Sequence, residues 1–124
     1  MNAAGVISPA RRELRDQHIG QERWPDSVLL LYLSDGLRLL KELRPDLFLG
    51  SGDTMATPTE LSETTDTLDV DEKQRPTLVD YVCSRALGED REDAQNVEES
   101  QRRLDSFYLR LYGLTPNTRS KKRG

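Results

Sequence analysis

The stretch SVLLLYLSDGLRLLKEL, from Ser27 to Leu43, is apolar over more of its circumference than a surface helix of a small protein needs. Its leucines recur at spacings of three and four, which predicts an α-helix. One stripe consists of Leu29, Leu33, Leu37, Leu40 and Leu43, and much of a second consists of Val28, Leu31, Tyr32 and Leu39. A helix with two apolar faces packs between neighbours, either within one chain or across a subunit boundary.

The boundaries of this helix are marked by residues on both sides. Asp26 can cap its start, and Trp24 precedes it at a position where an apolar residue can pack against the first turn. Pro45 cannot continue the helix, so we expect it to end at about Arg44. Gly36 costs about 1 kcal/mol relative to alanine inside a helix, so we expect it to permit close approach by another backbone. The residues assigned to subunit packing are Trp24, Leu29, Leu33, Gly36, Leu37 and Leu40.

Three further helices are expected around it. Ser8-Pro9 is a favourable helix start, and Gly20 would close a mostly polar first helix lying across the outside of the core, anchored by Ile7, Leu14 and Ile19. A third helix begins at Arg75-Pro76 and ends near Gly88. A long final helix ends at Gly113. The residues that recur in it at spacings of three and four are Val97, Gln101, Leu104, Phe107, Tyr108 and Leu111. The expected fold is therefore all-α: a four-helix bundle with the leucine-rich helix in the middle.

The segment from about residue 46 to 75 has a different composition, rich in Gly, Ser, Thr, Asp and Glu. Within it, TELSE and TLDVD alternate weakly between apolar and polar residues, which is compatible with a short β-hairpin. A structureless loop of this length is unusual inside a compact domain. We predict a projecting arm with contacts through Leu61, Leu68 and Val70, inserted into a helical domain of residues 1–114.

Charge is distributed unevenly along the 124 residues, whose net charge is −4. Four of the 18 cations and none of the 22 acids lie in the last ten residues, so the remainder carries 14 cations against 22 acids, a charge of −8. An acidic body argues against a protein held to DNA mainly by phosphate contacts. The basic tail, residues 115–124, has no apolar period and is expected to be disordered on its own. It suits an arm that reaches for an acidic groove or a phosphate, although terminal lysines and arginines also serve solubility alone.

No constellation for catalysis is found. His18 is the only histidine and lies on a polar segment, and Cys83 lies on an apolar helix face, where cysteine behaves as a small hydrophobe. DVDEK, residues 69–73, lacks the glycine and glutamate of a calcium loop, and GSGD, residues 50–53, lacks the lysine of a phosphate loop. We therefore expect no enzyme activity, no metal and no cofactor. The single cysteine, the start without a signal-peptide pattern and the short apolar run predict a soluble protein folded in a reducing cytoplasm, with no membrane partner.

Two stretches carry a resemblance to a known family. The first is VISPARRELRD…ERWPDSVLLLYLSDGLRLLKELRPDLF, and the second is PTLVDYVCSRALGEDREDAQNVEESQRRLDSFYLRLYG. They resemble bacteriophage head-to-tail adaptor proteins, also called connector or head-completion proteins. Members of that family look like this in order: a short polar helix, a Trp followed by a capping Asp, a leucine-rich helix with a Tyr-Leu-(Ser/Asn)-Asp-Gly step, Arg-Pro-Asp, and a closing helix hairpin. The resemblance covers roughly residues 6–113.

The resemblance implies a virion protein of the neck, between head and tail, that is present in the host cytoplasm during assembly. Such proteins form a ring of identical subunits, commonly twelve (a dodecamer), beneath the portal protein of the capsid. The ring extends the channel through which genomic DNA passes, without sequence-specific binding, and presents a surface to a downstream tail or nozzle protein. The C-terminal segment commonly clamps the portal, which here would be residues 115–124. The portal-binding residues implied are Thr115, Pro116, Arg119, Lys121, Lys122 and Arg123.

A second function class stays open on the residues alone. A small helical regulatory or nucleic-acid-binding protein could use the same basic C-terminal tail to grip phosphate groups. It would bind short DNA in a salt-dependent way as a monomer or dimer, whereas an adaptor would bind a portal ring.

Overall fold

A computed structural model of the chain describes residues 1–16, 23–48, 61–89 and 93–113. These residues are mostly helical, and no β-strand is found among them, so the expectation of an all-α chain is confirmed. The elements are α1 (Ala4–Leu14), α2 (Asp26–Leu43), η1 (Pro45–Leu47), η2 (Glu72–Gln74), α3 (Arg75–Gly88) and α4 (Ala94–Leu111).

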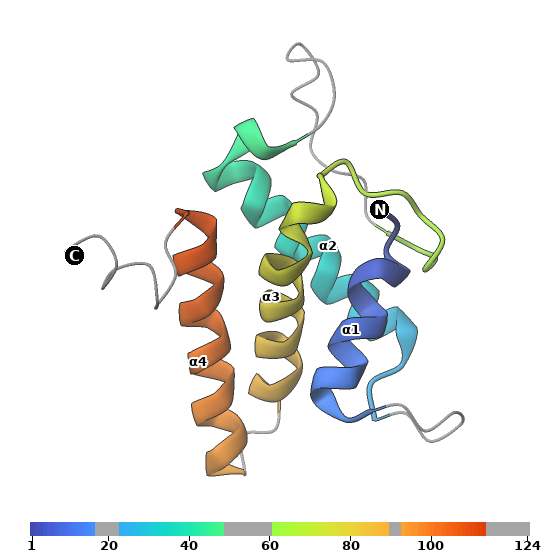
Figure 1. Cartoon of the computed structure of the whole chain (residues 1–124). Coiled ribbons are helices and arrows are strands. Elements are labelled where there is room, and N and C mark those ends of the chain that lie inside the picture. The colour runs from blue at the N-terminus through green and yellow to red at the C-terminus, as the bar shows by residue number, and fades with distance from the viewer. Residues whose placement is uncertain (17–22, 49–60, 90–92, 114–124) are drawn as a thin grey trace, which may run out of the picture.

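Helix α3 is the central element, with α1, α2 and α4 packed around it (Figure 1). Nine of its 14 residues are buried, whereas eight of the 18 residues of α2 are buried. The prediction that the leucine-rich helix lies in the middle was therefore wrong. Small side chains explain the difference, because Cys83, Ser84 and Ala86 let neighbouring helices approach α3 from several sides.

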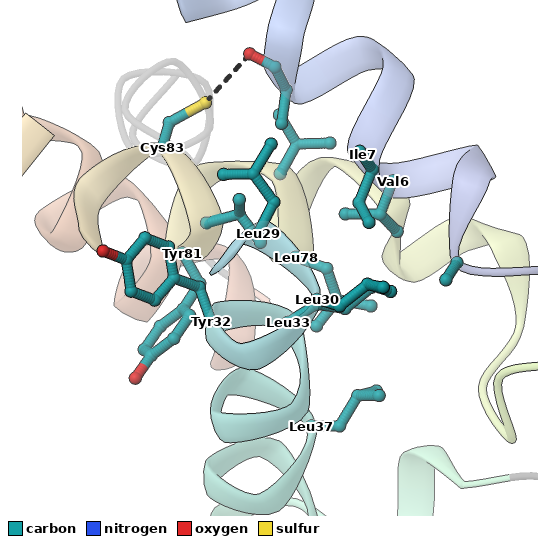
Figure 2. Packing of buried hydrophobic residues seen from close by; sticks show 14 of the residues in the cluster. Val6, Ile7, Leu29, Leu30, Tyr32, Leu33, Leu37, Leu78, Tyr81 and Cys83 are labelled. Carbon is teal, nitrogen blue, oxygen red and sulfur yellow. Dashed lines mark hydrogen bonds between the residues drawn. The ribbon is translucent and has the colours of Figure 1, made fainter. Parts of the chain in front are cut away.

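Helix α2 has the boundaries expected from the sequence, and one of its faces is buried. Leu29, Leu33 and Leu40 are fully buried. Figure 2 shows Leu29 and Leu33 in the core that α2 shares with α1 and α3. On the opposite side Leu31 remains 44% exposed. Asp26 does not cap the helix with its side chain and instead pairs with Arg11 of α1, Oδ1 to Nη2, at 2.6 Å. The apolar surplus of this helix is therefore hidden mainly within the single chain.

Helix α1 starts earlier than predicted and is less peripheral. It begins at Ala4, where Asn2 Oδ1 accepts the amide of Gly5 at 3.1 Å. Pro9 consequently lies inside the helix, where it leaves the carbonyl of Gly5 without its usual intrahelical donor. The predicted start at Ser8-Pro9 was wrong, because the cap at Asn2 and the burial of Val6 and Ile7 favour helix before the proline.

The end of α1 also differs from the prediction. The helix ends at Leu14, followed by Arg15 in the left-handed conformation with φ 57°. Asp16, which is buried, accepts the amides of Arg23 and Trp24 at 2.7 and 3.1 Å. These bonds fix the chain at the entrance to α2. The predicted closure at Gly20 and the anchor at Ile19 lie outside the described residues.

Residues 61–71 lie against the helices rather than projecting from them. Leu68 and Val70 are 3% and 1% exposed, and Leu61 is partly buried against the core. Thr67 pairs with Asn2 and Val70 with Phe48, each as an isolated bridge. In this part of the chain the predicted projecting hairpin is therefore wrong, since the backbone pairs with the chain start and with the residue after η1. Residues 49–60 of the predicted arm lie outside the described residues.

Helix α4 begins at a strong cap and divides the apolar residues predicted for it between two surfaces. Asp93 Oδ1 accepts the amides of Gln95 and Asn96 at 2.9 and 3.3 Å. Phe107 and Leu111 are buried against α3. The apolar residues of the described chain that remain exposed are Leu31, Val97, Tyr108 and Tyr112.

Candidate functional site

The closest packing between α2 and α3 occurs at Gly36. A Cβ at this position would lie 2.8 Å from Cδ2 of Tyr81, closer than real Cβ contacts come. The expectation of a close approach is confirmed within the chain, but the neighbour is the Tyr81 ring rather than a backbone. Tyr81 in turn contacts Phe107 of α4, with ring centroids 5.2 Å apart. Gly36 thus allows one aromatic side chain to link three helices.

The residues before Gly36 also have defined contacts. Asp35 Oδ2 accepts a hydrogen bond from Arg85 Nη1 at 3.1 Å, and the same nitrogen donates to the Tyr81 hydroxyl at 3.0 Å. The Arg85 guanidinium also lies over the ring of Tyr32, 4.8 Å from its centroid. Burial raises the pKa of Tyr32 above its usual value.

Ser34 connects α2 to the segment after it. Its hydroxyl donates to the carbonyl of Leu30 at 2.9 Å and accepts the amide of Leu61 at 2.9 Å. Each residue of the Ser34-Asp35-Gly36 step therefore makes a contact that joins α2 to another part of the chain. This polar step, which interrupts the apolar helix in the sequence, therefore serves to pack α2 against its neighbours.

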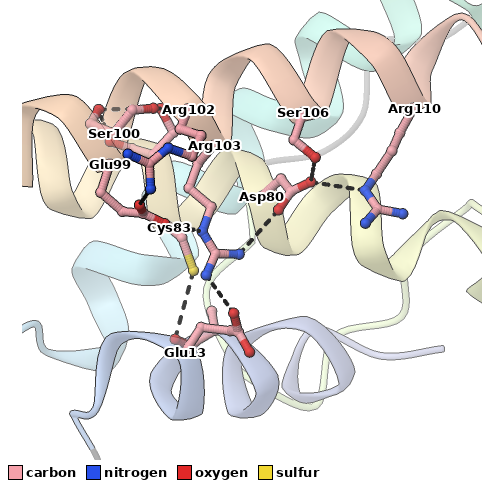
Figure 3. Close-up of polar contacts among 11 residues, drawn as sticks. Glu13, Asp80, Cys83, Glu99, Ser100, Arg102, Arg103, Ser106 and Arg110 are labelled. Carbon is pink, nitrogen blue, oxygen red and sulfur yellow. Dashed lines mark hydrogen bonds and ion pairs between the residues drawn. The ribbon is translucent and has the colours of Figure 1, made fainter. Parts of the chain in front are cut away.

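A charged cluster joins α1, α3 and α4 (Figure 3). At its centre is Asp80, which is 5% exposed. Its Oδ2 accepts from Ser106 Oγ at 2.6 Å and from Arg110 Nε at 2.9 Å, and its Oδ1 accepts from Arg103 Nη1 at 3.2 Å.

Arg103 extends this cluster to the other two acids. Its Nη2 pairs with Glu13 of α1, and its Nε pairs with Glu99 one turn earlier on α4 at 3.2 Å. Although burial alone would lower the pKa of Arg103, hydrogen bonds to Glu13 and Asp80 raise it. Each of the three nitrogens of this guanidinium is therefore paired with a carboxylate, which suits a structural role.

The sequence did not single out Asp80 or Arg103. The available signal was an acid within the apolar run Leu78-Val79-Asp80-Tyr81-Val82, because a carboxylate there must be paired if the helix is buried. A positively charged partner on a packed helix could have been anticipated on that ground. Which arginine supplies it depends on the rotation of α4, and that is a matter of tertiary packing.

The six residues assigned to subunit packing lie inside the chain's own core. Trp24 and Leu37 are 7% and 2% exposed, and Gly36 faces Tyr81. Leu29, Leu33 and Leu40 are fully buried. Their side chains therefore pack within one chain and do not form a surface that a second copy could contact. The reason is that α1 and α3 cover the leucine stripe.

The other assigned residues divide into two groups. Leu61, Leu68 and Val70, assigned to arm contacts, pack on the core of the same chain. The residues assigned to portal binding (Thr115, Pro116, Arg119, Lys121, Lys122 and Arg123) lie outside the described residues, as do His18 and residues 50–53.

The acids and the cysteine considered above for metal binding or nucleophilic chemistry lie among the described residues. Within them, no group of three or more His, Cys, Asp or Glu side chains could hold a metal ion. Asp71 instead caps η2 by accepting the amide of Lys73 at 2.9 Å. Burial raises the pKa of Cys83 to about 12, and its thiol donates weakly to the carbonyl of Ala10. A thiol with such a pKa is a poor nucleophile at neutral pH.

Comparison with known proteins identified no similar protein. No family model matches the sequence, and no match is found among curated proteins or solved structures. None of the helices in the described ranges has the length and apolar character needed to span a membrane.

Proposed function

We propose that this chain is a structural virion protein, a bacteriophage head-to-tail adaptor without catalytic activity. Copies of it would form a ring beneath the capsid portal, commonly of twelve, that extends the DNA channel and meets a tail protein on its other side. The finer fold that belongs to this proposal is a four-helix bundle-like adaptor fold with an extended C-terminal tail.

The observation that carries the proposal is the structural role of the residues on which the resemblance rests. Ser34, Asp35 and Gly36 each join α2 to another part of the chain. Arg44, from the Arg-Pro-Asp motif, pairs with Asp46 at 2.8 Å and donates to the carbonyl of Leu111 at the end of α4. The residues quoted for the resemblance therefore have structural roles in this chain, and this is the support for the proposal.

Ring contacts would use the apolar residues that the fold leaves exposed. Val97, Tyr108 and Tyr112 fall on one side of α4, 43%, 38% and 55% exposed, while Leu31 is on the outer face of α2. A cyclic ring joins two different surfaces of neighbouring subunits, and exposed apolar side chains at both α2 and α4 suit that arrangement. The acidic body suits a channel, since a wall that repels phosphates lets DNA slide.

Mass measurement of the purified chain, alone and mixed with a candidate portal ring, tests the proposal. We expect the mixture to contain a complex with many copies of this chain per portal. A chain that stays a single copy with every portal offered, while binding no other virion protein, would contradict the assignment.

Removal of residues 115–124 tests the proposed clamp separately. We expect circular dichroism to show an unchanged helical content, because no residue of the packed core is lost, and co-sedimentation with the portal to disappear. Docking that survives the deletion would reject the clamp while leaving the ring proposal standing.

The charge asymmetry favours one competing function, a small regulatory or nucleic-acid-binding protein that uses the basic tail. That protein would retard short duplex DNA as a monomer or dimer, and the affinity would fall steeply with added salt. Electrophoretic mobility measured at two salt concentrations, with and without residues 115–124, separates this function from the adaptor role.

A further inference from the structure

A hollow of about 290 Å³ lies where α1, the start of α3 and the end of α4 meet. Its lining is rich in arginine and also includes two prolines. The residues around it are Pro9, Arg12, Glu13, Arg75, Pro76, Val79, Asp80, Arg103 and Arg110. The hollow adjoins the Asp80 cluster but extends beyond it toward α1.

The charges of this hollow do not balance. Four arginines line it against two acids, and Arg103 is already engaged by Glu13, Asp80 and Glu99. Arg110 uses its Nε for Asp80, and its side chain is 42% exposed. When Glu99 is counted as a third acid, the four arginines still exceed the acids by one.

Two of the four arginines have no ion-pair partner among the described residues. Across the described ranges, no acid forms an ion pair with Arg12 or Arg75. The Nε of Arg75 is buried and lacks any hydrogen-bond partner there. A buried donor without a partner costs free energy of about 1–3 kcal/mol, so an acceptor that reaches Arg75 through the hollow would recover that cost.

We propose that this hollow binds a carboxylate side chain from an acidic segment of another protein, held by Arg12 and Arg75. Guanidinium groups match the planar fork of a carboxylate and bind it with paired hydrogen bonds. Pro9, Pro76 and Val79 supply an apolar wall for the residues next to that carboxylate.

A protein segment fits this hollow better than a nucleic acid does. The chain without its last ten residues has a charge of −8, which repels a polyanion with charges spread along its whole length. A peptide that brings one or two carboxylates meets only the local excess of positive charge. The inference concerns the isolated chain and does not depend on the proposed virion role.

The test uses the full-length chain and the peptide Leu-Glu-Leu-Glu-Leu, N-acetylated and C-amidated so that its two glutamates are its only charged groups, followed by NMR of the arginine side chains. We expect the peptide to shift the guanidinium signals of Arg12 and Arg75. The same peptide with glutamine in place of glutamate should not shift these guanidinium signals. Absence of any shift with the acidic peptide, or equal shifts with both peptides, would overturn the proposal.

Variants locate the binding site. R12Q changes an exposed side chain, and the R12Q/R75Q double variant removes both proposed ligands. We expect the affinity for the acidic peptide, measured by calorimetric titration because the double variant lacks both guanidinium signals, to weaken about three-fold in R12Q and about ten-fold or more in the double variant. The ten-fold loss corresponds to about 1.4 kcal/mol. R102Q is the matched control, because the Arg102 side chain is 70% exposed and lies outside this hollow. Its affinity for the acidic peptide should stay within about two-fold of that of the unchanged chain.

Thermal melting of each variant shows whether the fold is retained, and R12Q alone keeps the test valid if the double variant is unstable. Equal weakening in R12Q and R102Q would reduce the effect to overall charge and refute the site. Stronger shifts of the same signals with inorganic phosphate or short duplex DNA than with the acidic peptide would refute the carboxylate assignment.

Discussion

Helices α2 and α3 show that the most apolar helix of a chain and its most central helix need not be the same. Helix α2 has long runs of leucine but also an outer face with Arg38 and Glu42, so it can cover only one side of a core. Helix α3 has fewer large apolar residues, yet neighbours contact it on several sides because its small residues permit close packing. Position in the fold follows from how many faces can be covered rather than from total hydrophobicity.

The largest effect is expected from the polar centre of α3. Asp80→Ala leaves Arg103, Ser106 and Arg110 without their shared acceptor, which should lower the free energy of unfolding by about 3–5 kcal/mol. Urea denaturation measures this loss. Arg102→Ala, at an exposed ion pair, is the control and should change stability by less than about 1 kcal/mol. A variant at Asp80 as stable as the unchanged chain would show that the cluster adds nothing to holding the helices.

The next effect separates the two faces of α2. Leu33→Ala removes a fully buried side chain and should cost about 2–5 kcal/mol. Leu31→Ala, on the exposed face, should stay within about 0.5 kcal/mol in the isolated chain. Comparable losses at both positions would mean that the outer face of α2 is also covered in solution, as it would be in an oligomer.

A smaller effect is expected at the contact between the two helices. Gly36→Ala gains about 1 kcal/mol of helix propensity, but its Cβ meets the Tyr81 ring, and overpacking costs about 1–3 kcal/mol. We therefore expect a lower melting temperature. In a chain that also has Tyr81→Leu, the same change should become neutral or stabilising, and a double-mutant cycle measures this coupling. Identical effects in both backgrounds would contradict the close contact.

The smallest effect concerns Cys83 and appears only at high pH. Because burial raises the pKa of this thiol from 9.0 to about 12, the folded chain favours the protonated form. The resulting stability is fully present below pH 9 and is lost as the pH rises toward 12. Unfolding measured at pH 8 and pH 10 should show a steeper decline than in Cys83→Ala. At pH 8 a disulfide reagent should label Cys83 only as fast as the chain unfolds.

The elements that sequence patterns predicted best are those with strong local signals. The start of α3 at Arg75-Pro76 and the end of α2 before Pro45 follow from the restricted backbone of proline. The start of α1 was missed, because Ser8-Pro9 carries a strong local signal while the pairing of Asn2 with Thr67 and the burial of Val6 are tertiary. For the same reason Leu68 and Val70 were placed on an arm although they belong to the core.

The polar contacts were harder to predict than the helices. The close approach at Gly36 follows from the cost of glycine in a helix, which needs compensation somewhere. The neighbour that provides it, Tyr81, depends on the register between α2 and α3. The arginine-lined hollow involves α1, α3 and α4, whose residues are far apart in the sequence, so no local pattern reveals it.

The hydrogen bond from Arg44 to the carbonyl of Leu111 has a mechanical consequence. It ties the last turn of α2 to the last turn of α4, and Figure 1 shows that both helices finish at the same end of the molecule. Tension applied to the chain just after α4 would therefore pass to Arg44 and onward to Phe48, whose amide is bonded to the carbonyl of Pro45. Arg44 therefore gives the end of α4 a direct connection to the exit of α2, in addition to the packing of α4 on α3.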